Sequence, residues 1–206
     1  MMANAFPGLI LGGGLSRRMG EDKTQALLGE IPLLEIVANR LRPQVWALAV
    51  NLPIGHPLAG TYRNVPDTLA ERPGPLAGIL AGMQTFEDEA QHLLTVPGDA
   101  PFLPGDLVQR LANKHYADEI VIATSNGREH PVVGLWPTSL APDLQAWLET
   151  PDNRRVRDFI HRHRFRMVDF AMLPRRDGRG EIDPFFNINT PADLAFAREV
   201  LAGGGA

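Results

Sequence analysis

The sequence predicts an α/β fold, with a mostly parallel β-sheet flanked by helices on both faces. Two observations carry this prediction. Short apolar segments rich in branched residues recur along the first half of the chain, and segments with helical spacing of apolar residues separate them. Strand followed by helix, repeated, is the pattern of parallel sheets whose two faces are both covered. We therefore expect one sheet of about seven strands.

The expected strands are short and bounded by turn-forming residues, as buried strands usually are. They cover residues 6–11, 45–51, 92–98, 119–124 and 130–136. Residues 165–170 form a further candidate strand in the less regular second half of the chain.

Two helices are expected between the early strands, at residues 32–43 and 74–89. In each, apolar residues recur at helical spacing and form one face, and Pro32 suits the first turn. In a later segment, Thr190 is a natural N-cap, and Asp193 complements the positive end of the helix. The later segments with helical character are 104–116, 139–149, 154–163 and 190–202.

The composition indicates a single domain. With 206 residues and 44% hydrophobic content, the chain is long enough for one full core and short for two. We expect residues 1–202 to form this domain. Residues 203–206 have no side chains that could pack and are expected to form a flexible C-terminal tail.

Charge and residue usage exclude several classes of protein. A formal net charge of −4 argues against a protein that mainly coats nucleic acid. The absence of cysteine excludes disulfides, thiolate nucleophiles and cysteine-based metal sites. The N-terminus does not resemble a signal peptide, and no apolar run approaches the ~20 residues of a membrane helix. We therefore expect a soluble, cytoplasmic protein without nucleic-acid or membrane partners.

The most informative stretch is LILGGGLSRRMGEDKT, residues 9–24, which follows the first expected strand. It contains three consecutive glycines, Gly12, Gly13 and Gly14, and then three basic residues, Arg17, Arg18 and Lys23. Glycines let main-chain N–H groups approach an anion without interference from a Cβ atom. Ligands of parallel α/β sheets bind where strands end. The stretch therefore predicts a loop that binds a polyphosphate.

Neither of two familiar phosphate-binding patterns fits this loop. A Walker loop needs lysine directly after its last glycine, but two acidic residues separate Gly20 from Lys23. A dinucleotide fingerprint needs a third glycine where Arg17 stands. The histidines lack zinc-ligand spacing. A covalent hydrolase is also excluded, because no serine has the setting of a nucleophile elbow, including Ser16, Ser125 and Ser139.

The loop resembles the signature of molybdenum cofactor guanylyltransferases, L-A-G-G-x-S-x-R-M-G-x-D-K. Every fixed position of LGGGLSRRMGEDK matches except Gly12, where alanine is usual. Further segments match the family in the same order, namely NVPDT, GPLAGI, VPGDAPFLP and NINTPADL. The resemblance thus covers nearly the whole chain and implies a single Rossmann-like nucleotidyltransferase domain.

The activity implied by this resemblance is transfer of GMP from GTP to the terminal phosphate of molybdopterin. The products are the molybdopterin guanine dinucleotide cofactor and pyrophosphate. Gly13 matches the guanine-specific pattern, whereas the related cytidylyltransferase usually has L-A-A-G, so CTP is the alternative nucleotide. A non-catalytic carrier of GTP or of the finished cofactor is the alternative from another class. The presence of both Asp99 and Lys23 favours the enzyme.

The attacking phosphate is already ionised near neutral pH, so positioning and charge neutralisation should carry the catalysis. Asp99 in VPGDAPFLP is the expected ligand of Mg²⁺, which commonly binds through one or two carboxylates plus substrate phosphates. Lys23 and Arg17 are expected to stabilise the triphosphate and the leaving pyrophosphate. Arg18 is either a further contact or a solvated neighbour.

The resemblance also implies the binding residues. Those expected to bind the nucleotide are Leu11, Gly12, Gly13, Lys23, Asn51, Asp67 and Asp99. Either Asn51 or Asp67 can pair with guanine, and a carboxylate can instead hold ribose hydroxyls. Asn187 and Asn189, two residues apart, are expected to contact the pterin, with helix capping as the alternative.

Residues 154–166 are strongly basic, with six arginines and two histidines. A basic surface helix is the first interpretation. Alternatively, the segment attracts the pterin phosphate or docks an acidic partner protein that supplies or receives the cofactor. RNA binding is less favoured, because stacking aromatic residues are sparse.

Overall fold

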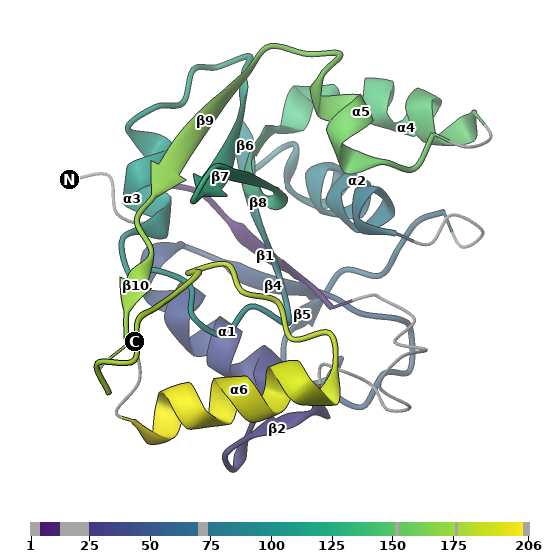
Figure 1. Ribbon diagram of the computed structural model, residues 1–206. Helices are drawn as coiled ribbons and strands as arrows, with labels where there is room; N and C mark the ends of the chain where they lie inside the picture. Colours follow the sequence, from purple (N-terminus) through teal and green to yellow (C-terminus); the bar gives the residue numbers. More distant parts are fainter. Residues whose placement is uncertain (1–4, 13–24, 70–73, 151–152, 176, 204–206) are drawn as a thin grey trace.

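The structure, a computed structural model, describes residues 5–12, 25–69, 74–150, 153–175 and 177–203. At its centre is a seven-stranded sheet with the order β5-β4-β1-β6-β8-β7-β9 (Figure 1). The strands are β1 (Gly8–Leu11), β4 (Leu48–Asn51), β5 (Arg63–Asn64), β6 (His92–Pro97), β7 (Ile120–Ser125), β8 (Arg128–Pro137) and β9 (Phe165–Phe170). The predicted fold class is confirmed.

Parallel pairing dominates this sheet. β1 pairs in parallel with both β4 and β6, β4 with β5, and β7 with β9. β8 runs antiparallel to its neighbours β6 and β7. It follows β7 through a two-residue turn, Asn126 and Gly127, in which both residues have positive φ angles. All the strands except β8 therefore end at the same edge, the carboxyl edge.

The helices are close to those expected from the sequence. They are α1 (Leu33–Leu41), α2 (Pro75–Phe86), α3 (Leu107–Ala112), α4 (Ala141–Glu149), α5 (Val156–Ile160) and α6 (Pro191–Ala202), with short 3₁₀ helices η2 (Arg42–Gln44) and η3 (Thr138–Leu140). α3 is shorter than predicted at both ends, and it begins late because Pro104 starts a turn before it, closed by the Leu107 N–H. Of the helices in the described ranges, none has both the length and the apolar character to cross a membrane.

Alternate residues of the strands contribute to two cores on opposite faces of the sheet. Ile10 belongs to the core that α1 and α3 cover, whereas its neighbour Leu9 belongs to the core that α2, α4 and α5 cover. Figure 1 shows these two groups of helices on opposite sides of the sheet. Both residues are fully buried. This double burial explains why the strands are almost continuously apolar.

α6 does not cover the sheet but packs beside β2 (Leu27–Leu28) (Figure 1). Its predicted N-cap is confirmed, since Thr190 Oγ1 accepts from Asp193 N over 3.1 Å. The Asp193 carboxylate in turn accepts from Thr190 N over 2.8 Å, which completes a capping box. Ala197 and Val200 of α6 share a third core cluster with Leu28.

The sequence patterns did not predict the shortest strands. These are β5 and the two-stranded ribbons β2 with β3 (Ile31–Pro32) and β10 (Leu173–Pro174) with β11 (Glu181–Ile182). Each has only two residues, so no alternation of apolar and polar residues can develop.

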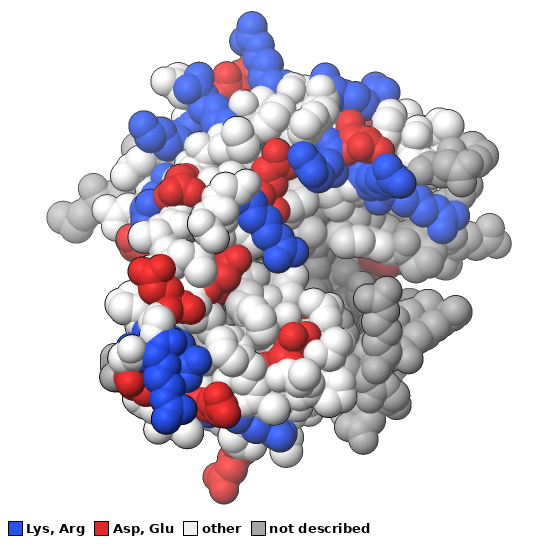
Figure 2. All heavy atoms as spheres, in the orientation of Figure 1, with Lys and Arg blue, Asp and Glu red and all other residues white. Residues whose placement is uncertain are grey.

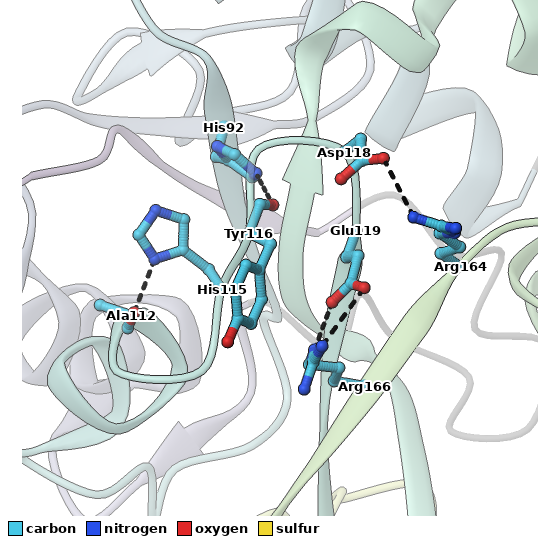
Figure 3. Close-up of polar contacts among 8 residues, drawn as sticks. All are labelled: His92, Ala112, His115, Tyr116, Asp118, Glu119, Arg164 and Arg166. Atoms are coloured by element: carbon cyan, nitrogen blue, oxygen red, sulfur yellow. Dashed lines mark hydrogen bonds and ion pairs between the residues drawn. The ribbon is translucent and has the colours of Figure 1, made fainter.

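At the amino edge of the sheet, the buried side chain of His92 lies in an aromatic cluster with Phe6 and His115. The ring centroids of His92 and His115 are 5.2 Å apart, and that of Phe6 is 5.9 Å from His92. His92 Nε2 contacts the Tyr116 carbonyl at 3.3 Å (Figure 3). Burial lowers the pKa of His92 and the charge of His115 lowers it further, against an opposing effect of the Tyr116 carbonyl.

Acid is therefore expected to destabilise the folded chain through His92. Above the ordinary pKa of 6.5 the ring is neutral in both states. As the pH falls below that value, the unfolded chain binds a proton that the folded chain does not. The free energy of unfolding then decreases, by at most about 1.4 kcal/mol per pH unit for one group.

Urea denaturation at a series of pH values between about 7.5 and 5.5 measures this effect. His92→Gln should give a flatter pH dependence than the unmodified protein. The control is the same change at the exposed His161, which should leave the pH dependence unaltered. Equal slopes for His92→Gln and the unmodified protein would contradict the assignment.

Candidate functional site

The carboxyl edge of the sheet brings together predicted nucleotide-binding residues from three strands. Leu11 on β1 is level with Asn51 on β4 and with the last residue of β6. Gly12 N donates to Asn51 O over 3.0 Å, and Gly98 N donates to Leu11 O over 2.9 Å. These main-chain bonds continue the pairing past the strand ends. Asp99, which follows directly, is thereby held at the same edge as Gly12.

Asn51 and Asp67 are joined by a hydrogen bond. Asn51 is 4% exposed and donates from Nδ2 to Val65 O and to Asp67 Oδ1, each over 2.8 Å. An amide nitrogen carries two protons, so both donors are used within the protein. Burial raises the pKa of Asp67, and the bond from Asn51 opposes this rise. Asn51 thus positions Asp67, whose other carboxylate oxygen has no hydrogen-bond partner among the described residues.

Gly78 on α2 makes room for Asn51. A Cβ atom at Gly78 would come within 2.4 Å of Asn51 Oδ1 and 2.8 Å of Leu11 Cδ2. One turn later, a Cβ at Gly82 would come within 2.6 Å of Leu9 Cδ2. The two glycines therefore allow α2 to lie close against β1. A glycine inside an expected helix, such as Gly78 within residues 74–89, is a sequence signal of close packing.

The segment before α6 lies against the turn that carries Asp99. Ile188 N donates to Asp99 O over 2.9 Å, so the residue between Asn187 and Asn189 is bonded to the main chain of the predicted metal ligand. Asn187 Oδ1 is buried and has no hydrogen-bond partner in the part of the chain that the structure describes. A buried oxygen in this state is unfavourable unless a ligand or an ion completes its contacts. The Asp99 side chain is half-buried.

The two asparagines differ in their surroundings. Asn189 is exposed, its N–H donates to Asp193 Oδ2 over 2.9 Å, and its Nδ2 donates to Asn187 O over 3.3 Å. Capping of α6 therefore accounts for the position of Asn189. It does not account for the buried side-chain oxygen of Asn187.

The remaining predicted residues, Gly13, Arg17 and Lys23, lie outside the described residues, as does Arg18. Within the described ranges, no three His, Asp or Glu side chains form a group that could hold a metal ion. Asp99 is thus not part of a preformed cluster of acidic or imidazole ligands in that part of the chain.

Residues 8–167 match the family model of the MobA-like NTP transferase domain. The chain belongs to this family. A molybdenum cofactor guanylyltransferase of Sinorhizobium fredii is 44% identical over 207 residues, which cover 95% of this chain and 91% of the relative. The enzyme of the same name from Rhizobium leguminosarum bv. trifolii is 47% identical over 197 residues, covering 94% and 92%. The family resemblance that the sequence indicated is confirmed for the chain as a whole.

A solved structure supports the fold of this MobA-like domain. Molybdopterin-guanine dinucleotide biosynthesis protein A from Archaeoglobus fulgidus superimposes with a TM-score of 0.74 at 24% identity, over 96% of this chain and 99% of that one. The family is one of nucleotidyltransferases, and this chain is such an enzyme. The carboxyl edge described above is therefore its candidate nucleotide site.

The basic segment 154–166 of the MobA-like domain is largely neutralised by acidic residues of other elements. The ion pairs are Arg157–Glu129, Arg162–Asp143, Arg164–Asp118 and Arg166–Glu119, the last two of which appear in Figure 3. Figure 2 shows basic and acidic side chains interspersed over the upper part of the molecule. This arrangement fits the interpretation as a solvated surface better than that of a docking site for an anion.

Replacing Gly78 by alanine should destabilise the protein, although alanine favours helices. Its Cβ would clash with Asn51 and Leu11, and overpacking of this kind costs about 1–3 kcal/mol. Urea denaturation measures the loss. Gly105→Ala is the control, because a Cβ at Gly105 meets no atom within 4 Å. A Gly78→Ala variant as stable as the unmodified protein would show that α2 does not depend on this close contact.

Proposed function

We propose that this protein transfers GMP from GTP to the terminal phosphate of molybdopterin, releasing pyrophosphate. The observation that carries the proposal is the convergence of Gly12, Asp67 and Asp99 at the carboxyl edge of a MobA-like domain. The names of the relatives support the same nucleotide and the same pterin. Ligands of open α/β sheets bind at this edge.

The chemistry depends on bringing two anions together. The terminal phosphate oxygen of molybdopterin attacks the α-phosphorus of GTP, a P–O bond forms, and the bond to the departing pyrophosphate breaks. The nucleophile is already ionised, so no side chain has to remove a proton from it. The protein contributes by placing the reactants and by neutralising their charge. Lys23 and Arg17 are the proposed cationic contacts to the triphosphate.

The residues around Asp99 fit a hard divalent cation such as Mg²⁺. The donors there are oxygens, namely the half-buried Asp99 carboxylate and the buried Asn187 Oδ1 that has no hydrogen-bond partner in the described part of the chain. Asn187 thus either completes the metal site or holds the pterin. Bound Mg²⁺ would neutralise charge on the triphosphate and on the leaving pyrophosphate.

Asp67 favours guanine over cytosine. Guanine offers two adjacent donors, N1–H and the 2-amino group, whereas cytosine offers one amino group beside acceptors. A half-buried carboxylate accepts the guanine pattern well, and Asn51 holds it in place. We therefore assign the contact with the base to Asp67 and a supporting role to Asn51, two roles that the sequence left open.

Pyrophosphate release by the purified protein with Mg²⁺ and molybdopterin tests this proposal. GTP should support release and CTP should not. Asp99→Asn should reduce the rate by about 10²–10³-fold, because the carboxylate that would hold the charge-neutralising Mg²⁺ is lost. Asp106→Asn, the same change at an exposed aspartate with no side-chain capping bond, should have little effect.

Each other outcome has a separate meaning. Release with CTP alone would retain the mechanism and refute the assignment of guanine to Asp67. Absence of release with either nucleotide, together with measurable binding of GTP, would favour the non-catalytic carrier. Full activity of Asp99→Asn would remove Asp99 from the metal site.

Lys23→Ala should also reduce turnover by about 10²–10³-fold, because one electrostatic contact to the triphosphate is lost. Lys114→Ala, at an exposed lysine that follows α3, is the matched control. Arg17→Ala and Arg18→Ala should be compared in the same assay, since Arg18 occupies the fixed arginine position of the family signature. Unchanged turnover of Lys23→Ala would exclude this lysine from catalysis.

The proposed reaction also implies transient protein partners. The product is a cofactor that acts in other enzymes, so proteins that supply molybdopterin or receive the finished dinucleotide should contact this enzyme. The ion pairs of the basic segment 154–166 give no support for placing this contact there.

A further inference from the structure

A buried polar cluster lies at the carboxyl edge, on β8 and β7, the two strands that follow β6 in the sheet order. It consists of Ser125 at the end of β7, His130 near the start of β8 and Asp183 after β11. Ser125 Oγ is 2.7 Å from His130 Nε2 and donates to Asp183 Oδ1 over 2.8 Å. The Asp183 Oδ2 atom is 3.5 Å from the same histidine nitrogen. Ser125 is fully buried and His130 is 9% exposed.

This cluster has the residue types of a hydrolytic triad without its geometry. A triad histidine uses one ring nitrogen for the serine and the other for the carboxylate. Here both Ser125 and Asp183 face the same nitrogen, Nε2, of His130. The single proton of Ser125 Oγ goes to Asp183, so Oγ accepts a hydrogen bond from His130 Nε2–H and cannot be deprotonated by it. The cluster therefore does not activate Ser125 as a nucleophile, and its hydrogen bonds serve to hold the three side chains in place.

Asp183 connects this cluster to the segment before α6 through further hydrogen bonds. Its Oδ1 also accepts from Phe185 N over 2.8 Å, and its main-chain oxygen accepts from Phe186 N over 3.0 Å. The Phe185 ring packs on His130, with centroids 4.8 Å apart. These contacts fix the turn that leads directly to Asn187 and to the Ile188 N–H bonded to Asp99 O.

We propose that His130, through Ser125 and Asp183, is a positioning residue for the binding site of the second substrate, the pterin phosphate. The order β4-β1-β6-β8-β7 places the strand of Asp99, β6, between the nucleotide-binding strands and the strands of the cluster. The two substrates must meet at Asp99. If GTP lies over β4 and β1, the space left for the pterin is on the other side of Asp99, beside β8 and the segment 183–189. This inference rests on the proposed function and specifies which of its two substrates the segment serves.

Steady-state kinetics of pyrophosphate release should separate this role from general stability. His130→Ala should raise the KM for molybdopterin by about tenfold and leave the KM for GTP within about twofold, because the loss of a buried hydrogen-bond partner displaces the 183–189 turn only. His130→Gln keeps a side-chain donor for Ser125 and should restore most of the affinity. His161→Ala, at an exposed histidine, is the control. Ser125→Ala should act in the same direction as His130→Ala.

A binding measurement keeps the test independent of turnover. Each protein is titrated with molybdopterin, and binding is monitored by pterin fluorescence. His130→Ala should show the same loss of affinity for molybdopterin, whereas its affinity for GTP, measured by calorimetry, should be unchanged. If the unmodified protein binds molybdopterin but releases no pyrophosphate, the proposed reaction fails while this comparison still tests the inference. Equal losses for both substrates, unchanged affinity for molybdopterin, or no recovery in His130→Gln would each overturn it.

Discussion

The position of β1 between β4 and β6 determines where the candidate site residues lie. Because β1 pairs in parallel with both neighbours, its end is level with theirs, and main-chain bonds link Gly12 to Asn51 and Gly98 to Leu11. A shift of one residue in either register would move Asp99 or Asn51 away from Gly12 and reverse the faces of the strand. Such a shift would also exchange the cores in which Leu9 and Ile10 are buried. Hydrophobic burial on both faces of the sheet therefore disfavours the shift and keeps the site residues level.

The candidate site also depends on groups that the proposed function assigns to support and not to substrate contact. Gly78 leaves space for the Asn51 side chain, Asn51 uses both amide protons to hold Asp67 and the main chain, and the capping box of α6 holds the chain after Asn187. These contacts act before any ligand binds, which is the condition for electrostatic stabilisation without reorganisation. The candidate site residues Asp67 and Asp99 lie in loops, and the strands before these loops determine their positions.

Much of this arrangement could be predicted from the sequence because it follows local patterns. The main strands, the helices and the Thr190 cap follow from apolar spacing and capping chemistry, and the glycine loop indicated an anion site. β5, with two residues, has no pattern to detect. The pairing of Asn51 with Asp67 and the cluster of His130 with Asp183 join residues 16 and more positions apart. Only the folded sheet brings such residues together, and no sequence spacing indicates them.

A crystal structure with a non-hydrolysable GTP analogue and Mg²⁺ would show whether the nucleotide binds at the carboxyl edge of the sheet. We expect the guanine edge to lie against Asp67, the phosphates over the turn that begins at Gly12, and the cation at Asp99. The β8 side of the site should remain open for the pterin. A nucleotide bound elsewhere, or one whose base lies on the His130 side of Asp99, would contradict the assignment of the carboxyl edge.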